Sequence, residues 1–397
     1  MSVSAAVEQR QVLLAQVQEV LEQLNHVEGA LDHPGLDAWL RARVAVRFKT
    51  LLQQSRASVL QLRDGVMGGD PLEEAWLHLH EIRSDSAPLF AECLALVEGG
   101  LVRGIELDRG LCRVADALLE ELSDLSDVNW ERFTVLDEGE YFHDLAEVIR
   151  LRFPDVSVWS VPVAAHEFGH YLGGRFEDSR DVALSSSFVR ARAAGDAAHA
   201  ILHEQFADCF ATYALGPAYP CMCVLQRFDP RTADVAGDEH PDATSRVALC
   251  LDVLNRMDRD AGLLSPFGRI IRVLGDTWDE IVLAAAGRRP ALADDARARL
   301  DAVGQQHWDL LEHAVPEVRY RGWLRASQVA RTLLEQHDDG ASLTTEAEDV
   351  RDVLNAAWAA RLGGPPAIAP ALAEWAWDAC QAQLPPHPPM PANGDGQ

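Results

Sequence analysis

The stretch His166-Glu167-Phe168-Gly169-His170 decides how this 397-residue chain is interpreted. A helix advances about 100° per residue, so histidines four positions apart lie on one face and can both reach one tetrahedral metal ion. Glu167 projects beside them, off the metal but within reach of a water molecule there, where a general base is needed. The pattern therefore predicts a helix that supplies two zinc ligands, His166 and His170, and a catalytic base.

The residues around this motif are typical of a helix with defined ends. Ser160 is suited to cap its start, and Pro162 suits a first helical turn. Gly173-Gly174 is expected to end it. The motif is therefore expected inside a short helix.

A second helix is expected over residues 196–215, with Asp196 as its cap and Gly216-Pro217 after its end. Glu204 and Asp208 interrupt the apolar stripe of this helix, and burying an unpaired carboxylate costs several kcal/mol. Zinc would compensate that cost. We therefore expect Glu204 to be the third protein ligand and Asp208 to accept the free ring N–H of a zinc-bound histidine, with the fourth position open to water.

This combination resembles the gluzincin metallopeptidases, whose HExxH helix is followed by a helix bearing ExxxD, here Glu204-Gln205-Phe206-Ala207-Asp208. A later stretch, His240-Pro241-Asp242-Ala243-Thr244-Ser245-Arg246, is similar to the HPxxxxR element of the branch that contains the CAAX-prenyl proteases. The resemblance covers about residues 155–256 and implies a zincin-like core. It also implies that His240 assists at the oxyanion and that Arg246 braces the metal-site helices.

The chain departs from that branch in its hydropathy. Many members of the branch are membrane proteins, whereas no window here approaches the roughly 18–20 consecutive apolar residues of a spanning helix. A second comparison is with small cytosolic HExxH peptidases that cleave transcriptional repressors and also use a downstream acidic ligand. No helix-turn-helix signal favours that comparison.

Composition narrows the class of protein. The chain is 48% hydrophobic, which is typical of a globular protein, and has a net charge of −27, which argues against binding to nucleic acid or to an anionic membrane. Residues 1–24 lack the basic start and compact apolar core of a secretory signal and are instead typical of an amphipathic helix. Seven scattered cysteines fit reduced thiols. These features predict a cytoplasmic location.

The expected organisation is mainly α-helical. A helical N-terminal region over residues 1–150 has breaks predicted at 33–35, 68–71 and 99–100. The metallopeptidase core, 151–258, is expected to hold one or two short strands between 149 and 161 and an irregular loop over 178–192. A helical C-terminal region spans 259–384, and the proline-rich tail 385–397 is expected to be disordered.

Three further features of the sequence are candidates for a functional role. Cys221-Met222-Cys223 is interpreted as packing, because it lacks the second close pair of a metal knuckle. His203 points about 100° away from Glu204 and is expected on the surface or behind the ligands. Tyr213 is a weaker second choice to His240 as an oxyanion donor.

The leading hypothesis is a soluble zinc-dependent metalloendopeptidase acting on a protein or peptide, with a regulatory protein partner as a further expectation. The alternative is a non-catalytic helical scaffold or binding protein in which zinc only staples helices. Glu167 argues against the alternative, because a closed structural site gains nothing from a carboxylate beside an open position.

Overall fold

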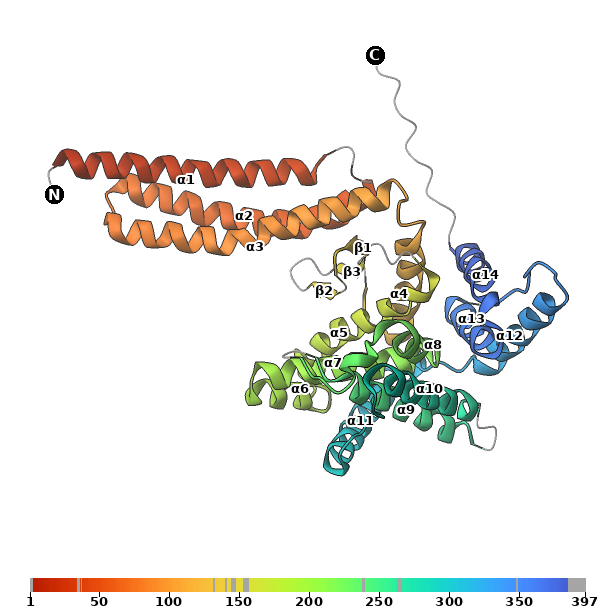
Figure 1. Ribbon diagram of the computed structural model, residues 1–397. Coiled ribbons are helices and arrows are strands. Elements are labelled where there is room, and N and C mark those ends of the chain that lie inside the picture. The colour runs from red at the N-terminus through yellow and green to blue at the C-terminus, as the bar shows by residue number, and fades with distance from the viewer. Residues whose placement is uncertain are drawn as a thin grey trace, which may run out of the picture. The chain divides into compact units, whose positions relative to one another are not determined.

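The computed structural model describes residues 3–33, 36, 38–130, 133–139, 141–143, 148–152, 157–237, 240–262, 266–347 and 349–384. This part of the chain is mainly helical, with fourteen α-helices and three short strands (Figure 1). The mainly-α class is therefore confirmed. The predicted tail, 385–397, lies outside the described residues.

The chain divides into two compact units. Unit 1 comprises residues 1–109, 135–139 and 143–153, and unit 2 comprises residues 110–134, 140–142 and 154–397.

Unit 1 is built on three long helices packed side by side, α1 (Val3–Leu31), α2 (Ala38–Gly68) and α3 (Leu72–Gly104) (Figure 1). Their apolar rows are buried, including Leu13, Val17 and Leu24 of the predicted N-terminal helix. The helices end and begin around the breaks predicted at 33–35 and 68–71.

The break predicted at residues 99–100 is wrong, because α3 continues to Gly104. A Cβ atom at Gly99 would lie 2.5 Å from the backbone oxygen of Leu136. Gly99 therefore serves a close approach between α3 and strand β1 (Thr134–Asp137) rather than the end of a helix.

The three strands form one small sheet in the order β1-β3-β2, with β2 at Tyr141–His143 and β3 at Val148–Arg152. Strand β3 confirms the first predicted strand, but it is the central strand and so offers no free edge to an extended peptide. Val158–Ser160 forms a 3₁₀ helix, so the second predicted strand is wrong there, and Val156 lies outside the described residues. Arg150 of β3, buried, pairs with Glu92 and Asp137.

Unit 2 contains the remaining helices. They are α4 (Leu111–Ser126), α5 (Val163–Glu177), α6 (Val182–Ala194), α7 (Asp196–Leu215), α8 (Ala218–Met222), α9 (Ala243–Asp260), α10 (Gly268–Ala286), α11 (Asp294–Ala314), α12 (Trp323–Asp338), α13 (Val350–Gly363) and α14 (Ala369–Ala382). Helices α10 to α14 lie within about five residues of the spans that the sequence pattern predicts for the C-terminal region, which are 270–286, 291–314, 323–336, 345–362 and 370–383. The loop predicted over 178–192 is wrong, because Asp181 caps α6 by accepting a hydrogen bond from Ala183 N at 2.9 Å.

Helices α5 and α7 pack closely, and two glycines of α5 permit this. A Cβ atom at Gly169 would lie 2.8 Å from Ala207 Cα, and one at Gly173 would lie 3.1 Å from His203 Nδ1. The helix stop predicted at Gly173-Gly174 is therefore wrong, since α5 continues to Glu177. Ser160 ends a 3₁₀ turn instead of capping α5, and Pro162 holds the cap position.

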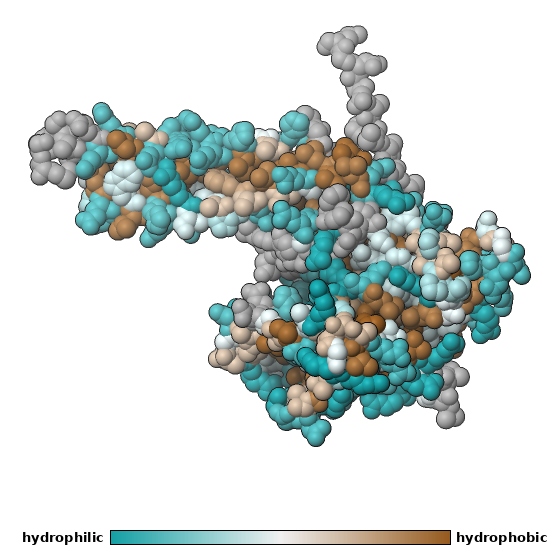
Figure 2. Space-filling view, viewed as in Figure 1, coloured by the Kyte–Doolittle hydropathy of each residue, from teal (hydrophilic) through white to brown (hydrophobic). Residues whose placement is uncertain are grey.

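Hydrophobic and hydrophilic residues are mixed on the described surface. Figure 2 shows hydrophobic patches interrupted by hydrophilic residues over the visible face. Among the described residues, none of the helices has the length and apolar character needed to cross a membrane.

Candidate metal centre

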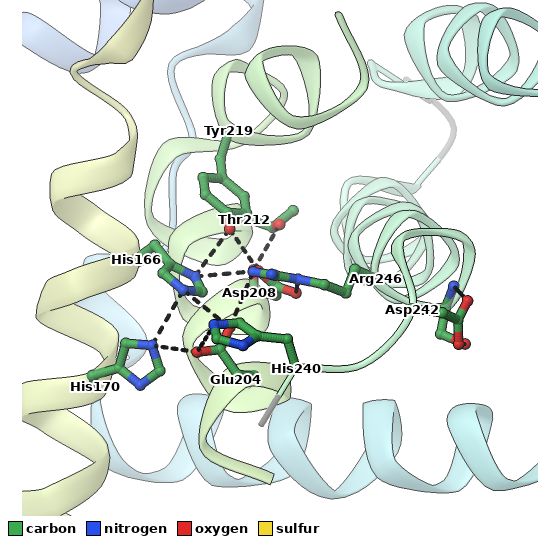
Figure 3. Close-up of polar contacts among 10 residues, drawn as sticks. His166, His170, Glu204, Asp208, Thr212, Tyr219, His240, Asp242 and Arg246 are labelled. Carbon is green, nitrogen blue, oxygen red and sulfur yellow. Dashed lines mark hydrogen bonds and ion pairs between the residues drawn. The ribbon is translucent and has the colours of Figure 1, made fainter. Parts of the chain in front are cut away.

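The two histidines of the predicted motif lie on one face of α5 and meet a carboxylate from α7. His166 and Glu204 are buried, at 6% and 8% exposure, and Glu167 beside them is 5% exposed. Helix α7 spans the predicted residues, although Gly195 takes the cap position expected for Asp196. His166, His170 and Glu204 are named the HExxH cluster below (Figure 3).

The side chains of the HExxH cluster lie close enough together to share one metal ion. His166 Nε2 lies 3.2 Å from His170 Nε2 and 3.5 Å from Glu204 Oε2, and His170 Nε2 lies 3.2 Å from Glu204 Oε1. Ligands about 2.0–2.1 Å from zinc occupy tetrahedron corners roughly 3.3 Å apart. The two histidine nitrogens are therefore close to that spacing, and each lies near a different oxygen of the Glu204 carboxylate.

The electrostatics of the HExxH cluster favour a cation. Burial alone would lower the pKa of His166, but the Asp208 and Glu204 carboxylates outweigh it and raise this pKa to about 10. Burial raises the pKa of Glu204, and the opposing effect of His166 and His170 holds it below its ordinary value. A divalent ion can supply the positive charge that these carboxylates attract.

Glu204 Oε2 gives a second test of fit. This atom is buried and accepts no hydrogen bond within the described part of the chain. Arg246 Nη2 lies 3.3 Å away, close enough for an ion pair, but without hydrogen-bond geometry. A buried carboxylate oxygen without a donor is unfavourable, so the residues present fit a metal ion such as zinc.

Asp208 and Tyr219 contact the second ring nitrogen of His166, Nδ1, on the side away from His170 and Glu204. His166 Nδ1 lies 3.2 Å from Asp208 Oδ1 and 2.9 Å from Tyr219 Oη, and the tyrosine hydroxyl donates to Asp208 Oδ1 at 2.5 Å (Figure 3). Asp208 thus lies next to the ring nitrogen of His166 that would remain free if Nε2 bound the metal, as the sequence predicts. Tyr219 was missed, because it belongs to α8, beyond the turn that follows α7.

Arg246 closes this network from α9. Its Nε donates to Asp208 Oδ2 at 2.7 Å and its Nη2 donates to Asp208 Oδ1 at 2.8 Å. Burial raises the pKa of Asp208, but Arg246 and then His166 outweigh it and lower the pKa to about 2. The carboxylate therefore stays ionised, and Arg246 links α9 to the residues that orient the first histidine.

The HPxxxxR element owes its geometry to a helix cap. Asp242 accepts a hydrogen bond from Ser245 N at 2.8 Å and so starts α9, which places Arg246 in the first turn and His240 ahead of it (Figure 3). His240 Nε2 lies 3.4 Å from Glu204 Oε1, and its side chain is 58% exposed. His240 therefore lies at the solvent-accessible rim of the HExxH cluster.

The other candidate residues of the sequence have different partners in the structure. Tyr213 is fully buried and its hydroxyl donates to Glu312 Oε1 at 2.7 Å. Cys221 and Cys223 are buried free thiols whose pKa values are raised by burial, as packing residues would be. His203 turns toward Glu177.

Comparisons with protein families, with curated proteins and with solved structures gave no match to this chain. Its chemistry is therefore inferred from the geometry of the site.

Proposed function

We propose that this chain is a zinc-dependent metalloendopeptidase with a gluzincin-like core, and that it hydrolyses peptide bonds in a protein or peptide. One observation carries the proposal. His166 and His170, on the helix that also bears Glu167, meet the Glu204 carboxylate of α7 with ligand atoms 3.2–3.5 Å apart. The buried Asp208, which would orient a ligand histidine, adds support.

In this proposal zinc supplies Lewis acidity, which lowers the pKa of water to about 7 and polarises the scissile carbonyl. Glu167 accepts the proton of the attacking water and returns it to the leaving amine. His240, at the rim, donates a hydrogen bond to the developing oxyanion. Asp208 and Tyr219 fix the His166 ring, and Arg246 keeps Asp208 ionised.

The number of ligands favours an enzyme over a scaffold stapled by zinc. Within the described residues, the group that meets at the HExxH cluster consists of His166, His170 and Glu204. Structural zinc sites take about four protein ligands, whereas catalytic sites take about three and leave one position for water or substrate. Glu167 would act as the general base for a water molecule in that remaining position.

The proposal is tested by comparing new protein N-termini in cells that carry wild type or Glu167→Gln. Termini that appear with wild type and vanish with the variant identify the substrate and the reaction together. His80→Ala, an exposed histidine on α3, is the matched control and should give the wild-type pattern. Identical termini from wild type and Glu167→Gln would reject the peptidase and leave the scaffold.

A further inference from the structure

A second group of metal-ligating side chains lies at the other end of the α5–α7 contact. Glu177 is the last residue of α5, and His199 and His203 lie one turn apart on α7. His199 Nε2 lies 2.8 Å and His203 Nε2 lies 3.3 Å from the same atom, Glu177 Oε2. The two rings are 4.4 Å apart between centroids. These three residues are named the second cluster below.

The second cluster repeats the HExxH cluster with the helices exchanged. Helix α5 gives two histidines to the HExxH cluster and a carboxylate to the second cluster, while α7 gives Glu204 to the first and two histidines to the second. The register explains this exchange. Gly169 meets Ala207, Gly173 meets His203 and Glu177 meets His199, so each step of four along α5 matches a step of four back along α7.

The two carboxylate oxygens of Glu177 have different partners, and both histidines contact the same one, Oε2. Arg192 Nε, from α6, pairs with the other oxygen, Glu177 Oε1, at 2.5 Å. Arg192 Nη2 also lies 3.4 Å from His199 Nε2, and the arginine side chain is 65% exposed. The ligand side chains of Glu177, His199 and His203 are 9%, 22% and 14% exposed, so an ion can reach them from solvent.

We propose that Glu177, His199 and His203 form a second site for a transition-metal ion such as Zn²⁺, Co²⁺ or Ni²⁺. Two imidazoles and one carboxylate suit these ions and disfavour Ca²⁺ and Mg²⁺, which prefer all-oxygen ligands. The site binds more weakly than the HExxH cluster, because Arg192 competes for its ligand atoms and water reaches it. This proposal goes beyond the peptidase function and does not depend on it.

The test uses the full chain with the first cluster disabled by His166→Ala and His170→Ala. Zinc titration of this double variant by equilibrium dialysis should give about one bound equivalent, and Co²⁺ should give the visible absorption of a site with nitrogen ligands. Adding His199→Ala or Glu177→Gln should weaken this binding by more than the roughly 10–100-fold that loss of a supporting group costs. Adding His80→Ala is the matched control and should change nothing.

A second readout covers the case in which the double variant does not fold. With the HExxH cluster intact, wild-type protein should bind about two zinc ions and the single variant His199→Ala about one. The reason is that each cluster has its own three ligands. Zinc should also raise the melting temperature of His199→Ala less than that of wild type, since a ligand bound only by the native state stabilises it. Equal stoichiometry and equal thermal shifts in wild type and His199→Ala would overturn the proposal.

Discussion

The HExxH cluster and the second cluster use the same two helices and the same ligand types, yet they differ in their surroundings. Glu167 follows the first histidine of the HExxH cluster, whereas Ala200 follows the first histidine of the second cluster. Asp208, from the buried side, supports the HExxH histidine, whereas the exposed Arg192 faces the second cluster. In our proposals, the spacing of the ligand residues sets where a metal ion would bind, and the neighbouring residues set what chemistry would follow there.

The largest expected effect comes from removing a ligand of the HExxH cluster. Glu204→Ala should lose the ion of that cluster and reduce peptide hydrolysis to the background rate, because catalytic zinc takes about three protein ligands. The second cluster should keep its ion, which separates the two clusters. Metal analysis after dialysis checks this, and full zinc occupancy of the HExxH cluster in Glu204→Ala would remove Glu204 from the ligand set.

Glu167→Gln tests the residue by which the clusters differ most. The substitution keeps the size of the side chain but removes the base, so turnover should fall by roughly 10²–10⁴-fold. Zinc content and melting temperature should stay close to wild type, because Glu167 is no ligand in this proposal. Metal analysis and steady-state kinetics on one preparation measure both. If Glu167→Gln turned over substrate at the wild-type rate, the HExxH cluster would be a structural site.

His240→Ala should lower kcat by about 10²–10³-fold if His240 donates to the oxyanion. KM should change less, since that contact forms chiefly in the transition state, and zinc should remain bound. Because the His240 side chain is exposed at the rim, the variant should fold as wild type does, and an unchanged melting temperature checks this. Loss of zinc would instead make His240 a ligand.

Asp208→Asn should weaken zinc affinity by roughly 10–100-fold, the usual cost of losing a group that orients a ligand histidine. It should also lower the melting temperature, because the Arg246 guanidinium loses its buried partner. Asp196→Asn, an exposed carboxylate on the same helix, is the matched control. Competition titrations with a zinc chelator measure the affinity, and equal values for the two variants would show that Asp208 does not orient His166.

The smallest expected effect is that of Tyr219→Phe. The variant removes one hydroxyl between His166 and Asp208, and one hydrogen bond contributes about 0.5–1.5 kcal/mol. Zinc affinity should therefore fall by only about 2- to 10-fold. The same chelator titration applies. A loss as large as that of Asp208→Asn would make Tyr219 the principal support of the histidine.

Patterns confined to one helix were predictable from the sequence. The four-residue spacing of His166 and His170, and of Glu204 and Asp208, places each pair on one helical face whatever surrounds it. The same reasoning gave the spans of α7 and α10 to α14 within a few residues. Local signals failed where a residue serves a neighbour, as at Gly99 and Gly173, which were predicted to break or end helices.

Tyr219 could not be predicted in the same way. Gly216, with a φ of 59°, turns the chain between α7 and α8, and a Cβ atom there would lie 2.5 Å from Tyr320. Whether the tyrosine then returns to His166 depends on that turn and on what packs against it. The four-residue spacing of His199 and His203 places both on one face of α7, but only the tertiary structure places Glu177 opposite them.

The sequence by itself determined the residue types of the candidate ligands, their helical faces and the mainly helical class, because these follow from residue chemistry and from a period of about 3.6 residues. Only the tertiary structure decided that α5 and α7 pair in a register that assembles two clusters, and that Tyr219 and Arg246 converge on Asp208. The physical reason is that the register between two helices is set by side-chain packing between residues far apart in the chain, which no local spacing encodes.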